Sequence, residues 1–231
     1  MTMKTMYQFL FICVAIAACL ATQPAAKAAD EMSAFKTGNR ILFQGDSITD
    51  GGRGRTEDPN HILGQDYAYI IAAKYGAMYP ERQLTFINRG VSGDTVSKLA
   101  SRWQTNTIDL KPDILSILVG VNDSEPVSEY EKTYDKLLAD TVAALPHVRL
   151  VLCDSFTWPS NVGEVQKART KVVERLAAKY HAPVVYFQKA FNEACKRAPA
   201  KYWIWDGVHP TYSGHQVMVD EWVRTVQSFY K

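Results

Sequence analysis

The amino-acid sequence predicts a doubly wound α/β domain built on a parallel sheet. Short apolar runs alternate with segments whose apolar residues recur every three or four positions, an alternation typical of strand–helix–strand crossovers. Several runs are almost continuously apolar, which favours strands that are covered on both faces, as parallel strands are. The chain has 231 residues, of which 47% are hydrophobic, so it is long enough to bury the full core of one domain.

Five apolar runs are expected to form the strands: residues 40–44, 84–88, 113–119, 148–154 and 183–187. Apolar faces with helical spacing mark the main helices, which are Tyr67 to Met78, Tyr130 to Thr141, Val165 to Tyr180 and Met218 to Phe229. Because the carboxyl ends of parallel strands share one edge of a sheet, the loops that follow strands are expected to form the ligand crevice.

Residues 1–28 are typical of a secretory signal peptide. Lys4 precedes a short apolar run over residues 9–18, and Ala26-Lys27-Ala28 has the small-x-small pattern of a cleavage site. The run is shorter than a membrane-spanning helix requires. Ile16-Ala17-Ala18-Cys19 also resembles a lipoprotein cleavage box. Soluble export to the periplasm or the medium and lipid anchoring to the outer membrane therefore both stay open, with soluble export favoured.

Residues 29–39 show no apolar period and are expected to be a polar leader, with the domain itself spanning residues 40–231. Removing residues 1–28 would take away two lysines and no acid, leaving 24 basic and 24 acidic residues. This balance offers no basic surplus for nucleic acid, and membrane contact is expected only through a lipid at the amino terminus. Cys153 and Cys195 would remain; a disulfide is compatible with export, but two buried thiols are favoured.

Two distant segments offer the parts of a serine hydrolase. Gly45-Asp46-Ser47 follows the first expected strand, and Asp206-Gly207-Val208-His209-Pro210 lies near the end of the chain. A serine hydroxyl needs a base before it can attack a carbonyl. His209 is the one histidine of five with an aspartate three residues before it and a proline behind it. A tight turn would set that carboxylate against one ring nitrogen and leave the other facing the serine. The purely structural alternative is a helix cap and a capped turn.

Two further segments offer donors for an oxyanion, which such a reaction requires. The glycine-rich stretch from Asn88 to Thr95 follows the second expected strand, and Gly120-Val121-Asn122-Asp123 follows the third. Either segment alone is also what an ordinary strand-to-helix turn contains. The order of these segments and their placement after strands favour a site.

Together these segments resemble the SGNH hydrolases, also called GDSL esterases, and the resemblance extends from Arg40 to Tyr230. It implies an enzyme, a carboxylic ester hydrolase, with a flavodoxin-like three-layer α/β/α sandwich and a five-stranded parallel sheet. Ile48 departs from the leucine of the family's nickname without touching the reacting atoms.

The resemblance also implies a role for each residue of the site. Ser47 would be the nucleophile, His209 the base and Asp206 the carboxylate that orients the base. The oxyanion hole would be made by the backbone N–H groups of Ser47 and Gly90 and by the side-chain amide of Asn122. No cofactor and no metal are expected, because the histidines are scattered along the chain.

The stretches Arg89–Gly93, Leu99–Trp103 and Leu115–Asp123 look like the acetylxylan-esterase-like branch of this family. That likeness implies an exported enzyme that removes acetyl groups from an acetylated oligo- or polysaccharide. Aromatic faces can stack on sugar rings, although burial is their commoner role. The side chains expected to contact substrate are Asp50, Trp158, Trp203 and Trp205. The long loop from Asp50 to Gly64 is expected to cover the site. Arg53 and Arg55 could bind an acidic sugar, but solvated loop charges are favoured.

Other functions are weighed against this one. The same family contains lysophospholipases and arylesterases, so a lipid or aryl ester is the main alternative substrate. A glycosidase would use two carboxylates, for which Asp46, Asp50 and Asp123 are the possible pairs, but it would not need the serine and histidine. A non-catalytic carbohydrate-binding module would keep the fold, because a fold alone does not decide function.

Overall fold

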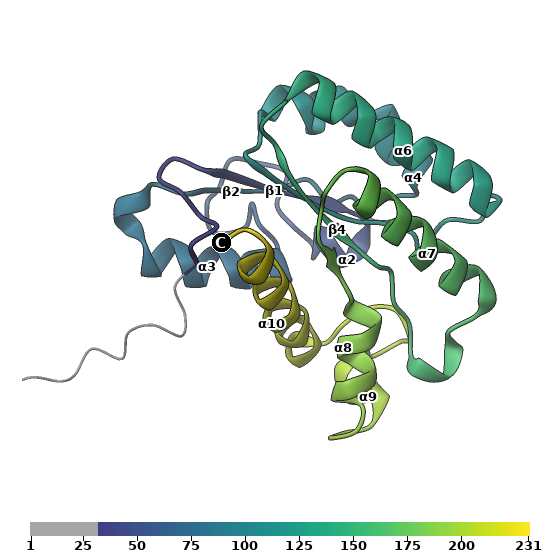
Figure 1. Cartoon of the computed structure of the whole chain (residues 1–231). Helices are drawn as coiled ribbons and strands as arrows, with labels where there is room; N and C mark the ends of the chain where they lie inside the picture. Colours follow the sequence, from purple (N-terminus) through teal and green to yellow (C-terminus); the bar gives the residue numbers. More distant parts are fainter. Residues whose placement is uncertain (1–31) are drawn as a thin grey trace, which may run out of the picture. The chain divides into compact units, whose positions relative to one another are not determined.

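Five parallel strands lie in the order β2-β1-β3-β4-β5 in the computed structural model, which describes residues 32–231 (Figure 1). The strands are β1 (Arg40–Gly45), β2 (Thr85–Asn88), β3 (Ile114–Leu118), β4 (Arg149–Cys153) and β5 (Val184–Val185). Every neighbouring pair is parallel. This is the flavodoxin-like order, in which the direction of winding reverses between β1 and β3. The predicted α/β fold is confirmed, and β5 is shorter than expected because a helix begins at Phe187.

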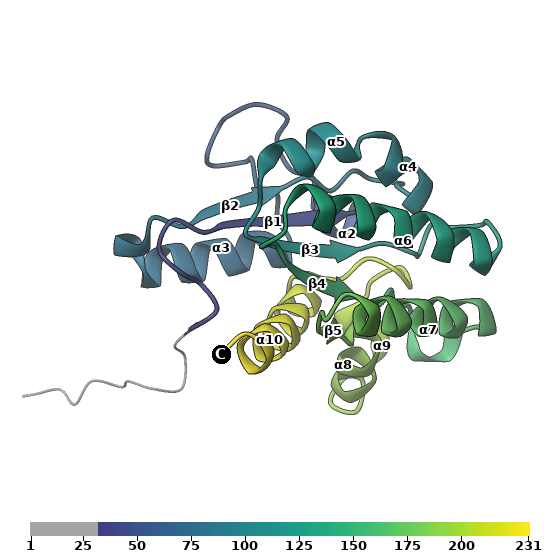
Figure 2. The same ribbon diagram turned by 45° about the horizontal axis from the view of Figure 1, so that its top comes forward.

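Alternate residues of each strand supply two cores, one on each side of the sheet. In β1, Ile41 and Phe43 belong to the first core and Leu42 to the second. The first core is covered by α3 (Tyr67–Met78), α8 (Phe187–Ala194) and α10 (Tyr212–Phe229), and the second by α4 (Val96–Ser101), α5 (Trp103–Asn106), α6 (Val127–Ala144) and α7 (Glu164–Lys179). Figure 1 shows α6 above the sheet and α3 and α10 below it, and the turned view in Figure 2 brings α6 to the front of the sheet. Burial on both faces explains why the strands are apolar throughout.

Short helical segments complete the joins between strands and long helices. They are α2 (Ser47–Asp50), η2 (Pro80–Arg82), η3 (Ile108–Leu110), η4 (Pro159–Asn161) and α9 (Ala200–Trp203). Of these, α2 and α9 lie just before or within the segments singled out for chemistry. Within residues 32–231, no helix is both long enough and apolar enough to cross a membrane.

Trp222 of α10 anchors the first core. Its side chain is fully buried, its Nε1 donates to Ser116 Oγ at 2.9 Å, and its ring lies beside that of Phe43, with centroids 5.6 Å apart. Truncating such a residue to alanine typically costs about 3–5 kcal/mol. Ser116 Oγ also lies 3.7 Å from Cys153 Sγ. Cys153 is buried and Cys195 is half-buried, and both are free thiols, so the disulfide weighed from the sequence is not formed.

The segment before β1 is part of the first core, which corrects the expected polar leader at residues 29–39. Met32, Ala34 and Phe35 are almost completely buried. The Arg82 side chain donates to the carbonyl oxygens of Met32 and Phe35, at 3.0 and 2.9 Å. A few apolar residues are too few to show a period in the sequence, and only the packing reveals them. The predicted signal peptide and Cys19 lie outside the described residues.

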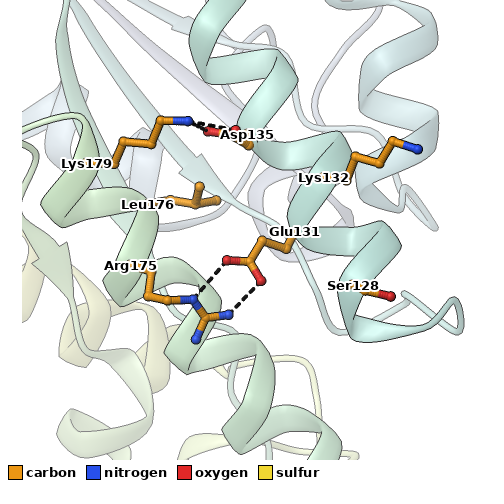
Figure 3. A pocket seen from close by; sticks show the side chains of 7 residues that line it. All are labelled: Ser128, Glu131, Lys132, Asp135, Arg175, Leu176 and Lys179. Carbon is orange, nitrogen blue, oxygen red and sulfur yellow. Dashed lines mark hydrogen bonds and ion pairs between the residues drawn. The ribbon is translucent and has the colours of Figure 1, made fainter.

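A pocket on the surface lies between α6 and α7 (Figure 3). Across it, Arg175 makes two hydrogen bonds to Glu131, at 2.8 and 2.6 Å, and Lys179 pairs with Asp135 at 2.7 Å. Leu176 lies between these pairs and belongs to the second core. The charged groups of the two helices thus satisfy one another over an apolar contact. Exposed pairs of this kind contribute little to stability by themselves.

Candidate active site

Ser47 opens the one-turn helix α2 directly after β1. The preceding residue, Asp46, caps this helix, since its Oδ1 accepts the backbone N–H of Ile48 at 3.0 Å. From Gly45 to Asp50 every residue except Ser47 is buried. The strand and the cap therefore hold the turn rigidly and leave the serine as its accessible side chain, at the carboxyl edge of the sheet.

Asp206 and His209 form a tight turn that ends against this serine. Asp206 Oδ1 accepts the backbone N–H groups of Val208 and His209 at 3.0 and 2.8 Å, and its Oδ2 lies 2.7 Å from His209 Nδ1. Gly207 has a φ of +101°, a conformation that glycine adopts without strain. His209 Nε2 lies 2.8 Å from Ser47 Oγ. The three side chains expected to form a triad thus make one continuous hydrogen-bonded chain.

The carboxylate of this chain is kept charged. Burial acts to raise the pKa of Asp206, but the hydrogen bonds from the backbone and side chain of His209 outweigh it and leave that pKa below its ordinary value. A charged carboxylate at Nδ1 fixes the proton on that nitrogen and leaves Nε2 as the acceptor that faces Ser47. The arrangement can therefore activate a serine hydroxyl.

Trp158 packs against the turn from Asp206 to His209 and is hydrogen-bonded to it. Its Nε1 donates to Ile204 O at 2.7 Å, and its backbone N–H donates to Gly207 O at 3.1 Å. The indole also lies against Gly207, where an added Cβ would meet it at 3.7 Å. Trp158 is half-buried. Its first role is thus to hold the loop that carries Asp206 and His209.

The other side chains expected to contact substrate differ in exposure. Trp205 is 58% exposed. Its backbone N–H donates to the carbonyl oxygen of His209 at 3.0 Å, which places its backbone beside that of the base. Trp203 is only 8% exposed, and its Nε1 donates to Ala198 O. Asp50 is 2% exposed and is bonded to Arg55 and Ser92. The structure therefore corrects the expectation for Trp203 and Asp50, which face inward and have their polar atoms paired.

The structure also corrects the expectation that the backbone N–H of Gly90 donates to the oxyanion. Gly90 is buried, and its N–H donates to Asn88 Oδ1 at 2.8 Å. An added Cβ there would collide with the backbone N of Asp50, so the loop packs tightly on α2 at this point. The N–H of Gly90 is thus already used. Sequence alone could not separate Gly90 from Gly93, because both are glycines of the same loop.

Gly93 is the glycine that faces open space. It is exposed, no atom lies within 4 Å of the position that a Cβ would take, and its N–H has no partner among the hydrogen bonds of residues 32–231. Asn122 is exposed as well, and its Nδ2 donates to Asp94 O at 3.1 Å. The amide of Asn122 and the peptide of Gly93 therefore lie in the same neighbourhood.

Two buried carboxyl groups, those of Asp46 and Asp123, lie next in sequence to Ser47 and Asn122. Burial raises the pKa of Asp46 and of Asp123 to about 7 each, and the Oδ2 atom of each has no hydrogen-bond partner within the described part of the chain. Asp123 Oδ1 accepts the N–H of Val96 at 2.9 Å, which fixes the start of α4. Asp46 and Asp123 are 1% and 6% exposed, so neither is placed to reach a glycosidic bond. Across residues 32–231 no group of three or more His, Cys, Asp and Glu side chains could hold a metal ion.

The fold and these side chains define a protein of the α/β class with a serine, an imidazole and a carboxylate at the carboxyl edge of its parallel sheet. The chain belongs to the GDSL-like lipase/acylhydrolase family, whose model matches residues 43–217. It is accordingly a carboxylic ester hydrolase, an esterase that removes acyl groups.

Individual relatives point the same way. The chain is 31% identical to an acetylxylan esterase of Geobacillus stearothermophilus, over 82% of this chain and 94% of the relative. The crystal structure of Axe2, an acetylxylan esterase of the same organism, matches with a TM-score of 0.74 and 31% identity, covering 83% of this chain and 95% of that one. LAE5, an α/β hydrolase from the metagenome of Lake Arreo, matches with a TM-score of 0.78 and 28% identity, covering 87% and 100%.

Proposed function

We propose that this protein is an exported serine esterase that removes acetyl groups from an acetylated oligo- or polysaccharide. The observation that carries the proposal is the hydrogen-bonded chain from Ser47 Oγ through His209 to Asp206, in an esterase similar to an acetylxylan esterase. Axe2 variants with one serine or one aspartate replaced by alanine are described as catalytic mutants, which supports a serine and an aspartate in the reaction. Export is supported by the sequence pattern of residues 1–28.

The reaction is acyl transfer in two steps. His209 takes the proton of Ser47 as the hydroxyl attacks the acetyl carbonyl, and it returns that proton to the departing sugar hydroxyl. His209 then takes a proton from water as that water attacks the acyl-enzyme, and it gives the proton to Ser47 Oγ as the bond to the acyl group breaks and acetate leaves. Asp206 stabilises the imidazolium in both steps without taking its proton.

The oxyanion receives three donors in this scheme. They are the backbone N–H groups of Ser47 and Gly93 and the side-chain amide of Asn122, with Gly93 in place of Gly90. Support comes from exposure, because Gly93 and Asn122 face solvent while Gly90 is buried with its N–H occupied. Donors held in position before the reaction stabilise the developing charge without reorganisation.

Trp205 supplies the sugar-binding surface. Its side chain is exposed, its backbone is bonded to that of His209, and a sugar ring can stack on an aromatic face. Trp158 contributes mainly by holding the turn at Gly207. Two other exposed aromatic side chains, Tyr202 and Tyr212, flank Trp205 in the sequence, so the segment that carries Asp206 and His209 is rich in exposed aromatic residues.

The test of this function is Ser47→Ala, with Ser160→Ala as an exposed serine control. We expect Ser47→Ala to lower turnover of an aryl acetate by about 10⁴-fold or more, because the nucleophile is lost. The control is expected to keep wild-type turnover and both variants to keep the wild-type circular dichroism spectrum. Retained activity in Ser47→Ala would exclude this serine as the nucleophile.

The substrate is tested with a panel. Acetate release from acetylated xylo-oligosaccharides is expected to exceed cleavage of lysophospholipids and of long-chain aryl esters. Cleavage of lysophospholipids without acetate release from the oligosaccharides would make the lipid esterase the correct function and leave the serine mechanism in place.

A further inference from the structure

We infer that the Asp50–Arg55 ion pair is a positioning pair that holds the oxyanion loop, residues 90–94, in place, and with it the N–H of Gly93. The pair acts on the reaction without touching the substrate. This inference rests on the proposed function, in which the Gly93 N–H receives the charge of the oxyanion.

Asp50 joins the nucleophile helix to the oxyanion loop. It is the last residue of α2, and its side chain is 3% exposed. Its Oδ2 accepts the N–H of Ser92 at 2.9 Å and the Ser92 hydroxyl at 3.0 Å, together with Arg55 Nη2 at 2.7 Å. Its Oδ1 accepts Arg55 Nη1 at 3.1 Å and Arg53 N at 3.2 Å. One carboxylate thus binds the residue just before Gly93 through two hydrogen bonds.

Arg55 keeps this carboxylate charged. Burial acts to raise the pKa of Asp50, but hydrogen bonds from Arg55 and from both groups of Ser92 outweigh it and hold that pKa below its ordinary value. A buried charge is tolerated when an opposite charge and hydrogen bonds satisfy it, and a guanidinium meets a carboxylate in the two-pronged geometry seen here. Arg55 is therefore paired, although the sequence predicted a solvated side chain.

The rest of the oxyanion loop is held from both sides. Arg53, also expected to be solvated, donates through Nε to Gly90 O at 2.9 Å. On the opposite side Arg102 pairs with the Asp94 carboxylate at 2.6 Å and donates to Arg89 O at 2.9 Å. Gly93 has open space where a Cβ would stand, and Lys98 Nζ donates to its carbonyl oxygen at 2.9 Å, so its position depends on hydrogen bonds and on its neighbours in the loop.

Position matters more here than it does in a structural turn. A donor displaced by about 1 Å can cost about 10²-fold in rate, because the oxyanion forms at one place only. If Asp50 served stability alone, its loss would lower the melting temperature and leave the kinetics of the folded enzyme unchanged. A substrate contact would instead raise KM. A positioning role lowers kcat and transition-state affinity together.

Asp50→Asn tests this in the full chain. The side chain keeps its shape, but one oxygen becomes an NH₂ group, so Arg55 loses one of its two acceptors in either orientation, and Ser92 loses its acceptor when the NH₂ group takes the place of Oδ2. We expect kcat for an aryl acetate to fall about 10–100-fold with KM within about 2-fold. Affinity for a trifluoromethyl ketone, which forms a tetrahedral adduct on serine, is expected to fall in proportion to kcat/KM. Arg55→Lys is expected to retain more kcat than Arg55→Ala, since it restores the charge.

The matched control is Asp113→Asn, the same chemical change at the opposite edge of the sheet, where Asp113 Oδ2 accepts the N–H of Arg40 at 2.7 Å. It is expected to keep wild-type kcat.

Wild-type kcat and ketone affinity in folded Asp50→Asn would overturn the inference, and so would a rise in KM alone. If Asp50→Asn fails to fold, Arg55→Ala and Ser92→Ala carry the test, and wild-type kcat in both would overturn it. Activity in Ser47→Ala would instead refute the proposed function.

Discussion

Ser47 and His209 are 162 positions apart in the sequence, yet Ser47 Oγ and His209 Nε2 lie 2.8 Å apart in the structure. Each could be singled out because its neighbours are unusual: a serine just after a strand, and a histidine bracketed by an aspartate and a proline. His215 shows how a histidine differs when it lacks such neighbours. Burial lowers its pKa to about 4, so it stays neutral inside α10, and its Nδ1 has no partner within residues 32–231.

Asn122 allows a separate test of the oxyanion hole. Asn122→Ala removes the side-chain donor assigned to the oxyanion, together with its hydrogen bond to Asp94 O. We expect kcat to fall about 10²–10³-fold with little change in KM. Steady-state kinetics with an aryl acetate measure both, and Asn161→Ala, at an exposed position of η4, is the control. A change in KM with unaltered kcat would contradict the role.

The chemistry of single residues could be predicted from the sequence only where spacing along the chain determines it. The turn from Asp206 to His209 is local, so the sequence showed which groups would meet. The choice between Gly90 and Gly93 depends on an Asn88 side chain that folds back on the loop. The pairing of Asp50 depends on an arginine in a loop without periodicity. Such contacts leave no pattern in the sequence.

At the level of elements, periodicity located the sheet and the long helices well. All strands were expected near their observed places, because a run buried on both faces is apolar throughout. The short helices α4, α5 and α9 were not foreseen, since one or two turns are too short to show a helical period. The ends of the helical faces were also misjudged: Val165 and Phe229 are about half exposed, and they lie in the end turns of α7 and α10.

The pocket between α6 and α7 offers a test of what holds two helices together. Arg175→Ala removes an exposed pair with Glu131 and is expected to cost less than about 1 kcal/mol of the free energy of unfolding. Leu176→Ala, one position further along, empties a site that is 3% exposed and is expected to cost about 2–5 kcal/mol. Urea denaturation of both variants measures the difference. Equal losses would contradict the dominance of apolar burial at this interface.

For the molecule as a whole, buried acids shape the dependence of stability on pH. Burial raises the pKa of several carboxyl groups, to about 7 for Asp46, Asp123 and Asp154 and to about 8 for Asp66. Between pH 4 and 7 the folded chain keeps protons that the unfolded chain releases at its ordinary pKa of 3.8. These groups therefore stabilise the fold fully below about pH 4, and their contribution falls as the pH rises to about 7, or to about 8 for Asp66. The lowered pKa of His215 acts in the opposite direction between about 4 and 6.5.

Asp154→Asn isolates one such proton. Asp154 is 2% exposed, and its Oδ1 accepts the N–H of Gln188 at 3.3 Å, a bond that an amide oxygen can also accept. We expect the stability of the variant relative to the wild type to rise by about 1.4 kcal/mol per pH unit between about pH 4.5 and 6.5. Urea denaturation at three pH values in this range provides the measurement. Parallel pH profiles would show that Asp154 titrates normally.

Phe35 and Trp222, near the two ends of the described chain, share one core, with ring centroids 6.2 Å apart. A ribosome delivers the first of these residues long before the second. Until the last helix has left the exit tunnel, the early apolar side chains have no completed partner surface, and the imidazole that the serine needs has only just been made. The core that joins the two ends and the active site are therefore completed only late in translation, and a product terminated before His209 would lack the base and be inert.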